Sequence, residues 1–308
     1  MSGAHPDSRE GTRPFALGPA LLFVPADRPE RLPKALERAD AAILDLEDAV
    51  AGHAKSVARE AMIAADPDPD RVIVRVNGPE TPEFARDLAA LAQTRIRTVM
   101  VAKAEDPASL APLAGYDVIA LCETARGVAH AEQLAAVPQV VALMWGAEDL
   151  VASLGGTSSR FADATYRDVA RLARARVLLA AGAFGKRAID AVHVDIGDLE
   201  GLSLEAQDAA ASGFAATACI HPGQVATIRD AYAPTPEQLR WAHGVLAEAE
   251  GGAFRFEGSR SCGTRARWSR GPGRSRGAGE RPGVVAPGPR VGALRARVKR
   301  LGQLATPA

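Results

Sequence analysis

The chain has 308 residues, of which 47% are hydrophobic, enough for one large core and in the usual range for an α/β barrel. Its formal net charge is zero, but about 12 of the 37 basic residues and a single acid, Glu280, lie in residues 258–308, so the preceding body is acidic. This acidic body argues against nucleic-acid binding by the folded part. The polar start lacks the apolar segment of a signal peptide, and no run is long enough to span a membrane, so we expect a cytoplasmic protein.

Short apolar runs rich in β-branched residues alternate with helical patterns along the chain. Such runs are typical of strands buried on both faces. We expect strands at 20–25, 42–46, 72–76, 98–101, 118–121, 140–144, 191–194 and 216–220. We expect helices at 29–39, 55–65, 82–91, 107–113, 128–135, 166–181 and 205–211, with further helices to about 249. Eight strand–helix units favour a closed (β/α)8 TIM barrel over an open sheet.

Composition divides the chain into three parts. Residues 1–17 are predicted to be a loose leader and residues 18–257 the barrel domain. Residues 258–308 are rich in Arg, Gly, Pro and Ser, and we expect disorder there because such a segment cannot bury enough apolar surface to offset the entropy of ordering. Two interpretations of this tail stay open: a basic segment for RNA or lipid, or a segment without a selected role, as a shifted reading frame would produce.

Three cysteines, Cys122, Cys219 and Cys262, show neither metal-ligand nor disulfide spacing. Cys122 and Cys219 lie in apolar strand candidates, so we expect them to be buried thiols.

Charged residues lie at or just past the carboxyl ends of six of the predicted strands. Glu47 and Asp48 follow the run at 42–46, Arg75 lies near the end of the run at 72–76, and the other four runs are followed by Lys103, Glu123, Asp149 and His221. In a parallel α/β barrel, reactive side chains lie just past the carboxyl ends of the strands. We therefore expect Arg75, Glu123 and Asp149 to converge on one mouth of the barrel, which favours an enzyme.

Two carboxylates at neighbouring strand ends suit Mg²⁺, which takes oxygen ligands and keeps several waters. The alternative is that Glu123 or Asp149 pairs with a base such as Arg126 or Arg160. Arg75 adds a planar guanidinium suited to a substrate carboxylate. A metal beside an arginine can hold an α-keto acid, so we expect Mg²⁺-dependent binding of a small keto acid.

Other residues near the predicted mouth allow a functional and a structural interpretation. One residue among Asp45, Glu47 and Asp48 could orient Arg75 or a metal-bound water, or Asp48 could cap the next segment. The Gly-rich loop at 155–159 could close over substrate, or be a simple linker. His221 could donate to substrate, although a histidine before proline is more often structural.

Several segments, in this order, resemble the citrate lyase beta subunit-like proteins of the HpcH/HpaI aldolase/citrate lyase superfamily, which have barrels of the pyruvate/phosphoenolpyruvate type. The matching segments are LFVPADRPER at 22–31, ILDLED at 43–48, VRVN at 74–77, ETARG at 123–127, WGAEDL at 145–150, GGTSSR at 155–160 and CIHP at 219–222. The resemblance covers about residues 18–257 and is closest to the stand-alone enzymes.

The resemblance implies a role for each matched residue. Glu123 and Asp149 would bind Mg²⁺, and the keto acid would contact Arg75 and Glu123, with Gly146 and Ala147 beside it. Glu47 would assist catalysis with Arg75. Asp27 and Arg28 would lie where the acyl-CoA enters.

The resemblance also implies an activity. The family cleaves or condenses 3-hydroxyacyl-CoA thioesters of the citramalyl-CoA or malyl-CoA type, releasing a keto acid and an acyl-CoA, and is usually homotrimeric. In the family a segment after Phe-Glu-Gly brings an acid/base Asp to a neighbouring protomer, but here Ser259 follows Gly258 and that Asp is absent. Impaired activity and a weakened trimer are therefore expected. Two alternatives remain: a metal-dependent aldolase acting on free hydroxy-keto acids, and a keto-acid-binding relative without catalysis.

Overall fold

The computed structural model describes residues 13–241. The chain divides into two compact units, Met1–Tyr232 and Ala233–Ala308, and the whole barrel belongs to the first unit. In the described part of the second unit a helix begins at position 236. Two hydrogen bonds cap its start: the Gln238 backbone N–H donates to the Thr235 side chain, and the Thr235 backbone N–H donates to the Gln238 side chain. The predicted tail at 258–308 and Cys262 lie outside the described residues.

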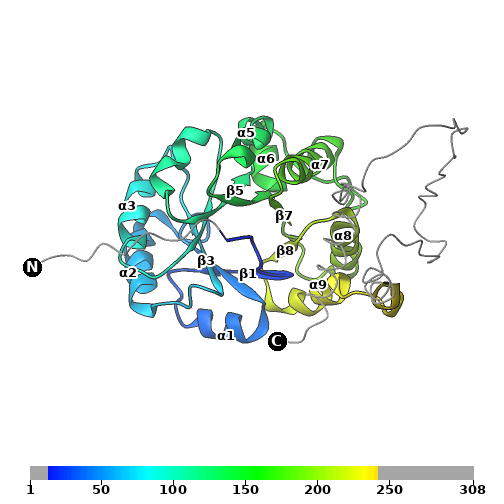
Figure 1. Ribbon diagram of the computed structural model, residues 1–308, viewed down its shortest axis with the longest axis horizontal. Helices are drawn as coiled ribbons and strands as arrows, with labels where there is room; N and C mark the ends of the chain where they lie inside the picture. Colours follow the sequence, from blue (N-terminus) through cyan, green and yellow to red (C-terminus); the bar gives the residue numbers. More distant parts are fainter. Residues whose placement is uncertain (1–12, 242–308) are drawn as a thin grey trace, which may run out of the picture. The chain divides into compact units, whose positions relative to one another are not determined.

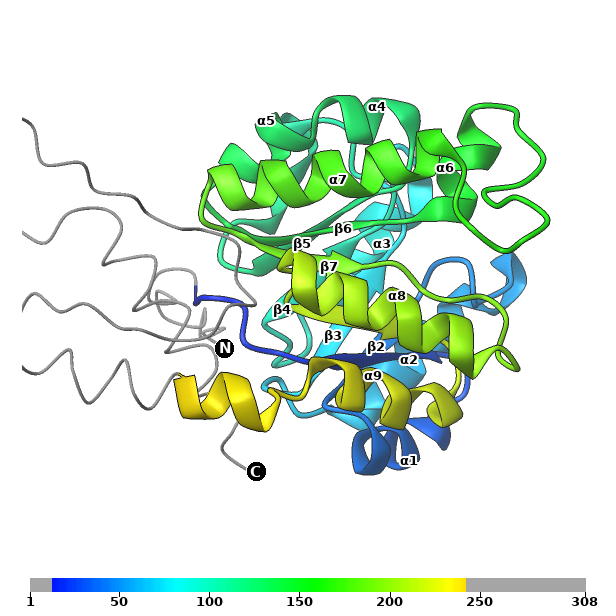
Figure 2. The same cartoon turned by 90° about the vertical axis from the view of Figure 1, so that its right-hand side faces the viewer.

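Eight parallel strands close into a barrel in sequence order, from β1 round to β8 and back to β1, which confirms the predicted fold class. Helices follow the strands and form the outer layer in both views (Figures 1 and 2). The strands are β1 (Ala20–Pro25), β2 (Ala41–Asp45), β3 (Val72–Val76), β4 (Thr98–Val101), β5 (Asp117–Cys122), β6 (Val140–Trp145), β7 (Arg187–Asp190) and β8 (Ala216–Cys219). The α-helices are α1 (Arg31–Arg38), α2 (Lys55–Ala65), α3 (Pro82–Leu91), α4 (Ala125–Ala129), α5 (Ala131–Ala136), α6 (Ala147–Ser153), α7 (Asp168–Ala183), α8 (Leu199–Ser212) and α9 (Val225–Tyr232).

Alternate residues of each strand build two apolar cores. Side chains such as Leu21, Ile43 and Ile73 form one buried cluster with Phe15, while their strand neighbours pack with the surrounding helices in a second, larger cluster. Successive side chains of a strand point to opposite faces, so a strand that is apolar throughout supplies both cores.

The cysteine prediction is confirmed for the two cysteines that the structure describes. Cys122 and Cys219 are buried, and burial raises the pKa of each thiol to about 12. Both side chains therefore stay protonated and apolar in the wall of the barrel.

The predicted strand at 191–194 is wrong. The strand that closes the barrel here is β7, at Arg187–Asp190, and the chain has left the sheet by Val194, which is 45% exposed. Charged residues at both ends concealed this strand in the sequence. The Asp190 carboxylate tolerates burial because Trp145 donates its indole N–H at 2.6 Å and Arg174 donates at 2.8 Å, so tertiary contacts override the unfavourable local pattern.

Helical predictions differ from the structure mainly at their boundaries. The segment at 107–113 is a 3₁₀ rather than an α-helix, the helix expected at 128–135 is divided into α4 and α5, and α8 begins six residues before its predicted start. Helix α6, which carries Asp149, follows β6 directly and is not among the predicted helices. No helix in the described part of the chain is long and apolar enough to cross a membrane.

Candidate active site

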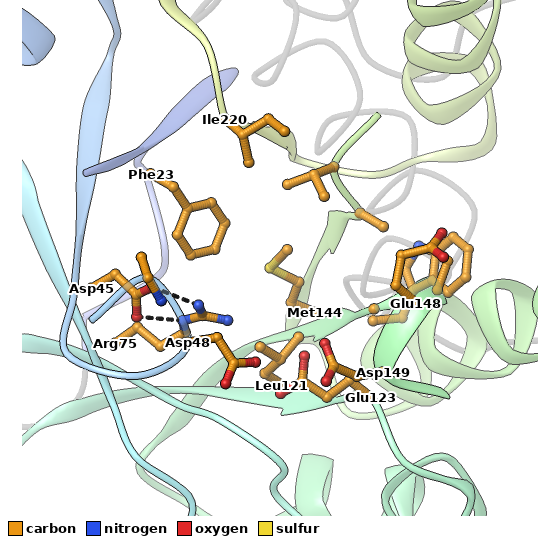
Figure 3. Close-up of a pocket in the computed structure, with 16 residues that line it drawn as sticks. Phe23, Asp45, Asp48, Arg75, Leu121, Glu123, Met144, Glu148, Asp149 and Ile220 are labelled. Carbon is orange, nitrogen blue, oxygen red and sulfur yellow. Dashed lines mark hydrogen bonds and ion pairs between the residues drawn. The ribbon is translucent and has the colours of Figure 1, made fainter. Parts of the chain in front are cut away.

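A cavity of about 230 Å³ opens at the carboxyl ends of the strands. In Figure 3 the carboxylates of Glu123 and Asp149 lie together on one side, and the Arg75 guanidinium points toward the same space. Most of the other lining side chains are apolar, and the charged exceptions are Asp45, Asp48 and Glu148. The predicted convergence of Arg75, Glu123 and Asp149 on one mouth is therefore what the structure shows. The lining residues are Phe23, Asp45, Asp48, Ala49, Arg75, Leu121, Glu123, Met144, Trp145, Gly146, Ala147, Glu148, Asp149, Ala191, Val192 and Ile220.

Arg75 is held by a carboxylate from the neighbouring strand. Asp45 lies opposite Arg75 in the register of β2 and β3, and it accepts from Nε at 2.7 Å and from Nη2 at 2.6 Å. The Phe23 ring lies 4.8 Å from the guanidinium carbon. Burial lowers the pKa of Arg75, but hydrogen bonds and charge from Asp45, with the charge of Glu47, outweigh this and raise it. Arg75 is thus a fixed cation whose orientation is set before any substrate arrives.

Asp45 also shapes the loop that follows β2. One carboxylate oxygen accepts the Glu47 amide at 2.9 Å, and the other accepts the Ala49 amide at 3.0 Å. The sequence leaves open which of three acids orients Arg75, and the structure shows that Asp45 makes the bidentate contact while Glu47 lies 3.2 Å from Nη1.

Glu123 and Asp149 come from two consecutive strand–helix connections. Glu123 follows the last residue of β5 and is 2% exposed, and Asp149 lies in the first turn of α6 with a side chain 36% exposed. Burial raises the pKa of Glu123 to about 8, and the charge of Asp149 adds to this rise. A cation between the two carboxylates would relieve this cost, because opposite charge favours the ionised form.

Gly146 is required beside Glu123 for steric reasons. A Cβ atom at position 146 would lie 2.9 Å from the Glu123 Cβ and 3.0 Å from its Oε2. Gly146 precedes α6 and Ala147 begins it, and both line the cavity. The structure therefore places these two predicted residues at the site.

Lys103 follows β4, and the sequence gives it no role beyond its place at a strand end. Its backbone N–H donates to Glu123 Oε1 at 2.9 Å, and its ammonium donates to Glu47 Oε1. The same ammonium lies 3.4 Å from Asp48 Oδ2 and 3.6 Å from Asp149 Oδ1. The sequence carries one signal for this role of Lys103: it is a basic residue at a strand end, and several of the other strand ends carry acids.

Three further residues named from the sequence, Asp27, Arg28 and His221, do not line the cavity. Asp27 and Arg28 lie in the turn after β1 and are not among the cavity-lining residues. His221 has a structural contact, because its Nδ1 accepts the Gly223 amide at 3.1 Å and so caps the turn after β8.

The alternative partners of the two carboxylates are engaged with other acids. Arg126 lies 3.9 Å from Glu105, and Arg160 binds Glu205. Neither arginine is therefore the partner that the sequence offered as the alternative to a metal.

The residues present fit a magnesium ion. Within residues 13–241, no group of three or more His, Cys, Asp and Glu side chains is arranged to hold a metal. The protein would therefore supply two ligands to the ion, the carboxylates of Glu123 and Asp149, which both line the cavity. Mg²⁺ commonly binds through one or two carboxylates, while substrate oxygens and waters complete its shell.

The family model described as HpcH/HpaI aldolase/citrate lyase matches residues 20–222, which contain this whole mouth. The chain belongs to this family. The citrate lyase subunit beta-like protein of Mycobacterium tuberculosis is 57% identical over 245 residues, covering 79% of this chain and 90% of the relative. The mitochondrial citramalyl-CoA lyase of Homo sapiens is 32% identical over 277 residues, covering 78% and 80%.

One similar solved structure contains bound ligands. The crystal structure of protein CitE from Mycobacterium tuberculosis, in complex with magnesium, acetoacetate and coenzyme A, has 49% sequence identity and a TM-score of 0.76, and the match covers 93% of this chain and 99% of that one. The predicted family and the barrel are thus confirmed together.

Proposed function

We propose that this member of the family is a Mg²⁺-dependent carbon–carbon lyase that acts on a 3-hydroxyacyl-CoA thioester of the citramalyl-CoA or malyl-CoA type. The observation that carries the proposal is the pair Glu123 and Asp149 beside a pre-oriented Arg75 in one cavity. The citramalyl-CoA lyase among the relatives, and the relative crystallised with magnesium, acetoacetate and coenzyme A, support the substrate class.

In this proposal Glu123 and Asp149 hold the Mg²⁺ ion, and Arg75 binds the carboxylate of the keto acid. When bound, the ion supplies a Lewis acid that stabilises negative charge on the substrate oxygen. Asp45 takes one hydrogen bond each from Nε and Nη2, and Glu47 lies 3.2 Å from Nη1. A guanidinium has five N–H donors, so Arg75 keeps donors for a substrate carboxylate where it lines the cavity. Apolar lining residues such as Phe23, Leu121 and Met144 would reduce the access of water to the bond that breaks.

The reaction conserves atoms and charge. The 3-hydroxyl loses its proton, its oxygen becomes the keto carbonyl, and the electron pair of the cleaved C–C bond passes to the thioester as an enolate. The enolate then takes up a proton at carbon, which requires a general acid. We propose Asp48 for proton exchange, because it lines the cavity and its side chain is 61% exposed, although it also lies 3.4 Å from the Lys103 ammonium. Glu47 is buried between Arg75 and Lys103 and is better placed to position them.

The test is a lyase assay over a panel of 3-hydroxyacyl-CoA thioesters and the corresponding free hydroxy acids, with Mg²⁺ or with excess chelator. We expect metal-dependent release of a keto acid from a thioester. Release from free acids alone would establish the alternative aldolase, and keto-acid binding without turnover would establish a non-catalytic relative. The homotrimer stays a prediction, which light scattering coupled to gel filtration would check.

A further inference from the structure

Lys103 reaches four acidic residues at the mouth of the barrel through its side chain and its backbone. Its ammonium donates to Glu47 and lies 3.4 Å from Asp48 and 3.6 Å from Asp149, while its backbone N–H donates to Glu123 at 2.9 Å. The side chain is 37% exposed, so the ammonium is only partly solvated. One residue therefore touches both proposed metal ligands and two acids of the loop after β2.

The backbone of Lys103 adds a second, independent observation. Its φ angle is +49°, in the left-handed region that favours glycine. A non-glycine residue persists there only when surrounding contacts determine it, and such residues gather at functional sites. The conformation directs the Lys103 amide to Glu123 while the side chain turns to Glu47.

We propose that Lys103 is a positioning residue: its ammonium is the resident counter-cation of Asp149 and competes with the divalent ion, and on ion binding it is retained by Glu47 and Asp48. This inference rests on the proposed metal site. The physical reason is that two cations at one carboxylate repel each other, so the ammonium must give up Asp149 when the ion arrives. The ion pair between Glu47 and Lys103 then remains, and it holds in place both the lysine and the loop that carries Glu47 beside Arg75.

A structural role and a counter-cation role predict opposite effects on ion affinity. If Lys103 only supports the fold of the mouth, a neutral residue there disorders Glu123 and lowers the affinity for the metal ion. If Lys103 is a competing cation, the neutral residue removes a positive charge beside Asp149 and raises the affinity for the metal ion.

Lys55 offers a matched control at the same loop. Its ammonium donates to the Leu46 carbonyl at 2.8 Å, the Glu47 carbonyl at 2.9 Å and Asn77 Oδ1 at 2.7 Å, without a carboxylate among these partners. Removing the Lys55 charge therefore disturbs the loop without removing a cation from Asp149.

The experiment titrates the full-length chain with Mn²⁺ and follows free Mn²⁺ by electron paramagnetic resonance, with Mg²⁺ as competitor. It compares the parent with Lys103→Met, Lys103→Gln, Lys103→Arg, Lys55→Met and Asp149→Asn, each checked for folding by circular dichroism. We expect the two neutral Lys103 variants to bind Mn²⁺ on the order of tenfold more tightly. Lys103→Arg should stay near the parent, and Lys55→Met should not bind more tightly.

Turnover gives the second readout. With saturating Mg²⁺, Lys103→Met should lose kcat with little change in KM, because Glu47 is no longer held. Unchanged or weaker Mn²⁺ binding in both folded neutral variants would overturn the inference. If the parent binds Mn²⁺ through Asp149 yet cleaves no thioester, the proposed function fails while the affinity comparison still decides the role of Lys103. If the parent binds no Mn²⁺, both fail together.

Discussion

At the carboxyl ends of the strands, the paired side chains of Asp45 and Arg75 are 1% and 11% exposed, whereas at the amino ends the side chains of Arg13 and Asp70 are 62% and 73% exposed. At the amino end Phe15 packs into the buried cluster inside the barrel, and the ion pair there is long, 3.8 Å between Arg13 Nη1 and Asp70 Oδ1. The carboxyl end instead buries ionised groups, which is costly unless they are paired. The two ends therefore differ in kind: the carboxyl ends hold desolvated, paired charges at the candidate site, and the amino ends carry exposed charges.

The largest expected effect comes from removing a proposed metal ligand at the carboxyl ends of the strands. Glu123→Gln should lower kcat/KM by at least about 10²-fold, because one of two proposed metal ligands loses its charge. The metal-free variant should melt no lower than the parent, because a buried carboxylate has been removed. Lyase assays and thermal melts measure the two effects. Asp117→Asn, whose carboxylate accepts the Arg13 amide at the amino end, should leave turnover unchanged.

The next prediction concerns stability at both ends. Asp45→Ala leaves Arg75 buried without its bidentate partner, so the free energy of unfolding should fall by about 3–5 kcal/mol. Asp70→Ala removes an exposed pair and should cost at most about 1 kcal/mol. Urea denaturation measures both, and equal losses at the two ends would contradict the contrast.

A smaller effect tests how tightly the mouth is packed. Gly146→Ala places a methyl group 2.9 Å from the Glu123 Cβ and should displace the Glu123 carboxylate. The affinity for Mg²⁺ should therefore fall about tenfold. Calorimetric titration measures the affinity. The control is Gly182→Ala in α7, where a Cβ meets nothing within 4 Å, and which should bind Mg²⁺ as the parent does.

The smallest effect is a pH dependence. The folded state holds the Glu123 proton up to a pKa of about 8, whereas the unfolded chain releases it near 4.5, so this group's contribution to the free energy of unfolding falls as pH rises between those values. A metal ion must displace the same proton, so Mg²⁺ affinity should rise toward about pH 8 and then level off. The melting-temperature increase caused by Mg²⁺, followed across that window, measures it. An equally steep rise in Glu123→Gln would show that another group titrates.

Much of the barrel was predictable because its strands are locally distinctive. The strand at Val72–Val76 has the bounds that the sequence predicts, and the apolar run before Glu123 placed that carboxylate at the mouth. Strand β7 was missed because only two apolar residues separate Arg187 from Asp190, and the burial of Asp190 depends on Trp145 and Arg174 from other elements. Local pattern cannot reveal a charge whose partners are distant in the chain.

By itself, the sequence determined the strand–helix alternation and the order of acids and bases at the strand ends. Parallel closure then requires those ends to meet, so Arg75, Glu123 and Asp149 were predictable as neighbours. The tertiary structure decided which charges pair. Register sets Asp45 opposite Arg75, and the left-handed backbone of Lys103 turns its amide to Glu123 and its ammonium to another acid. Pairing depends on side-chain direction and distance in space, which spacing along the chain does not encode.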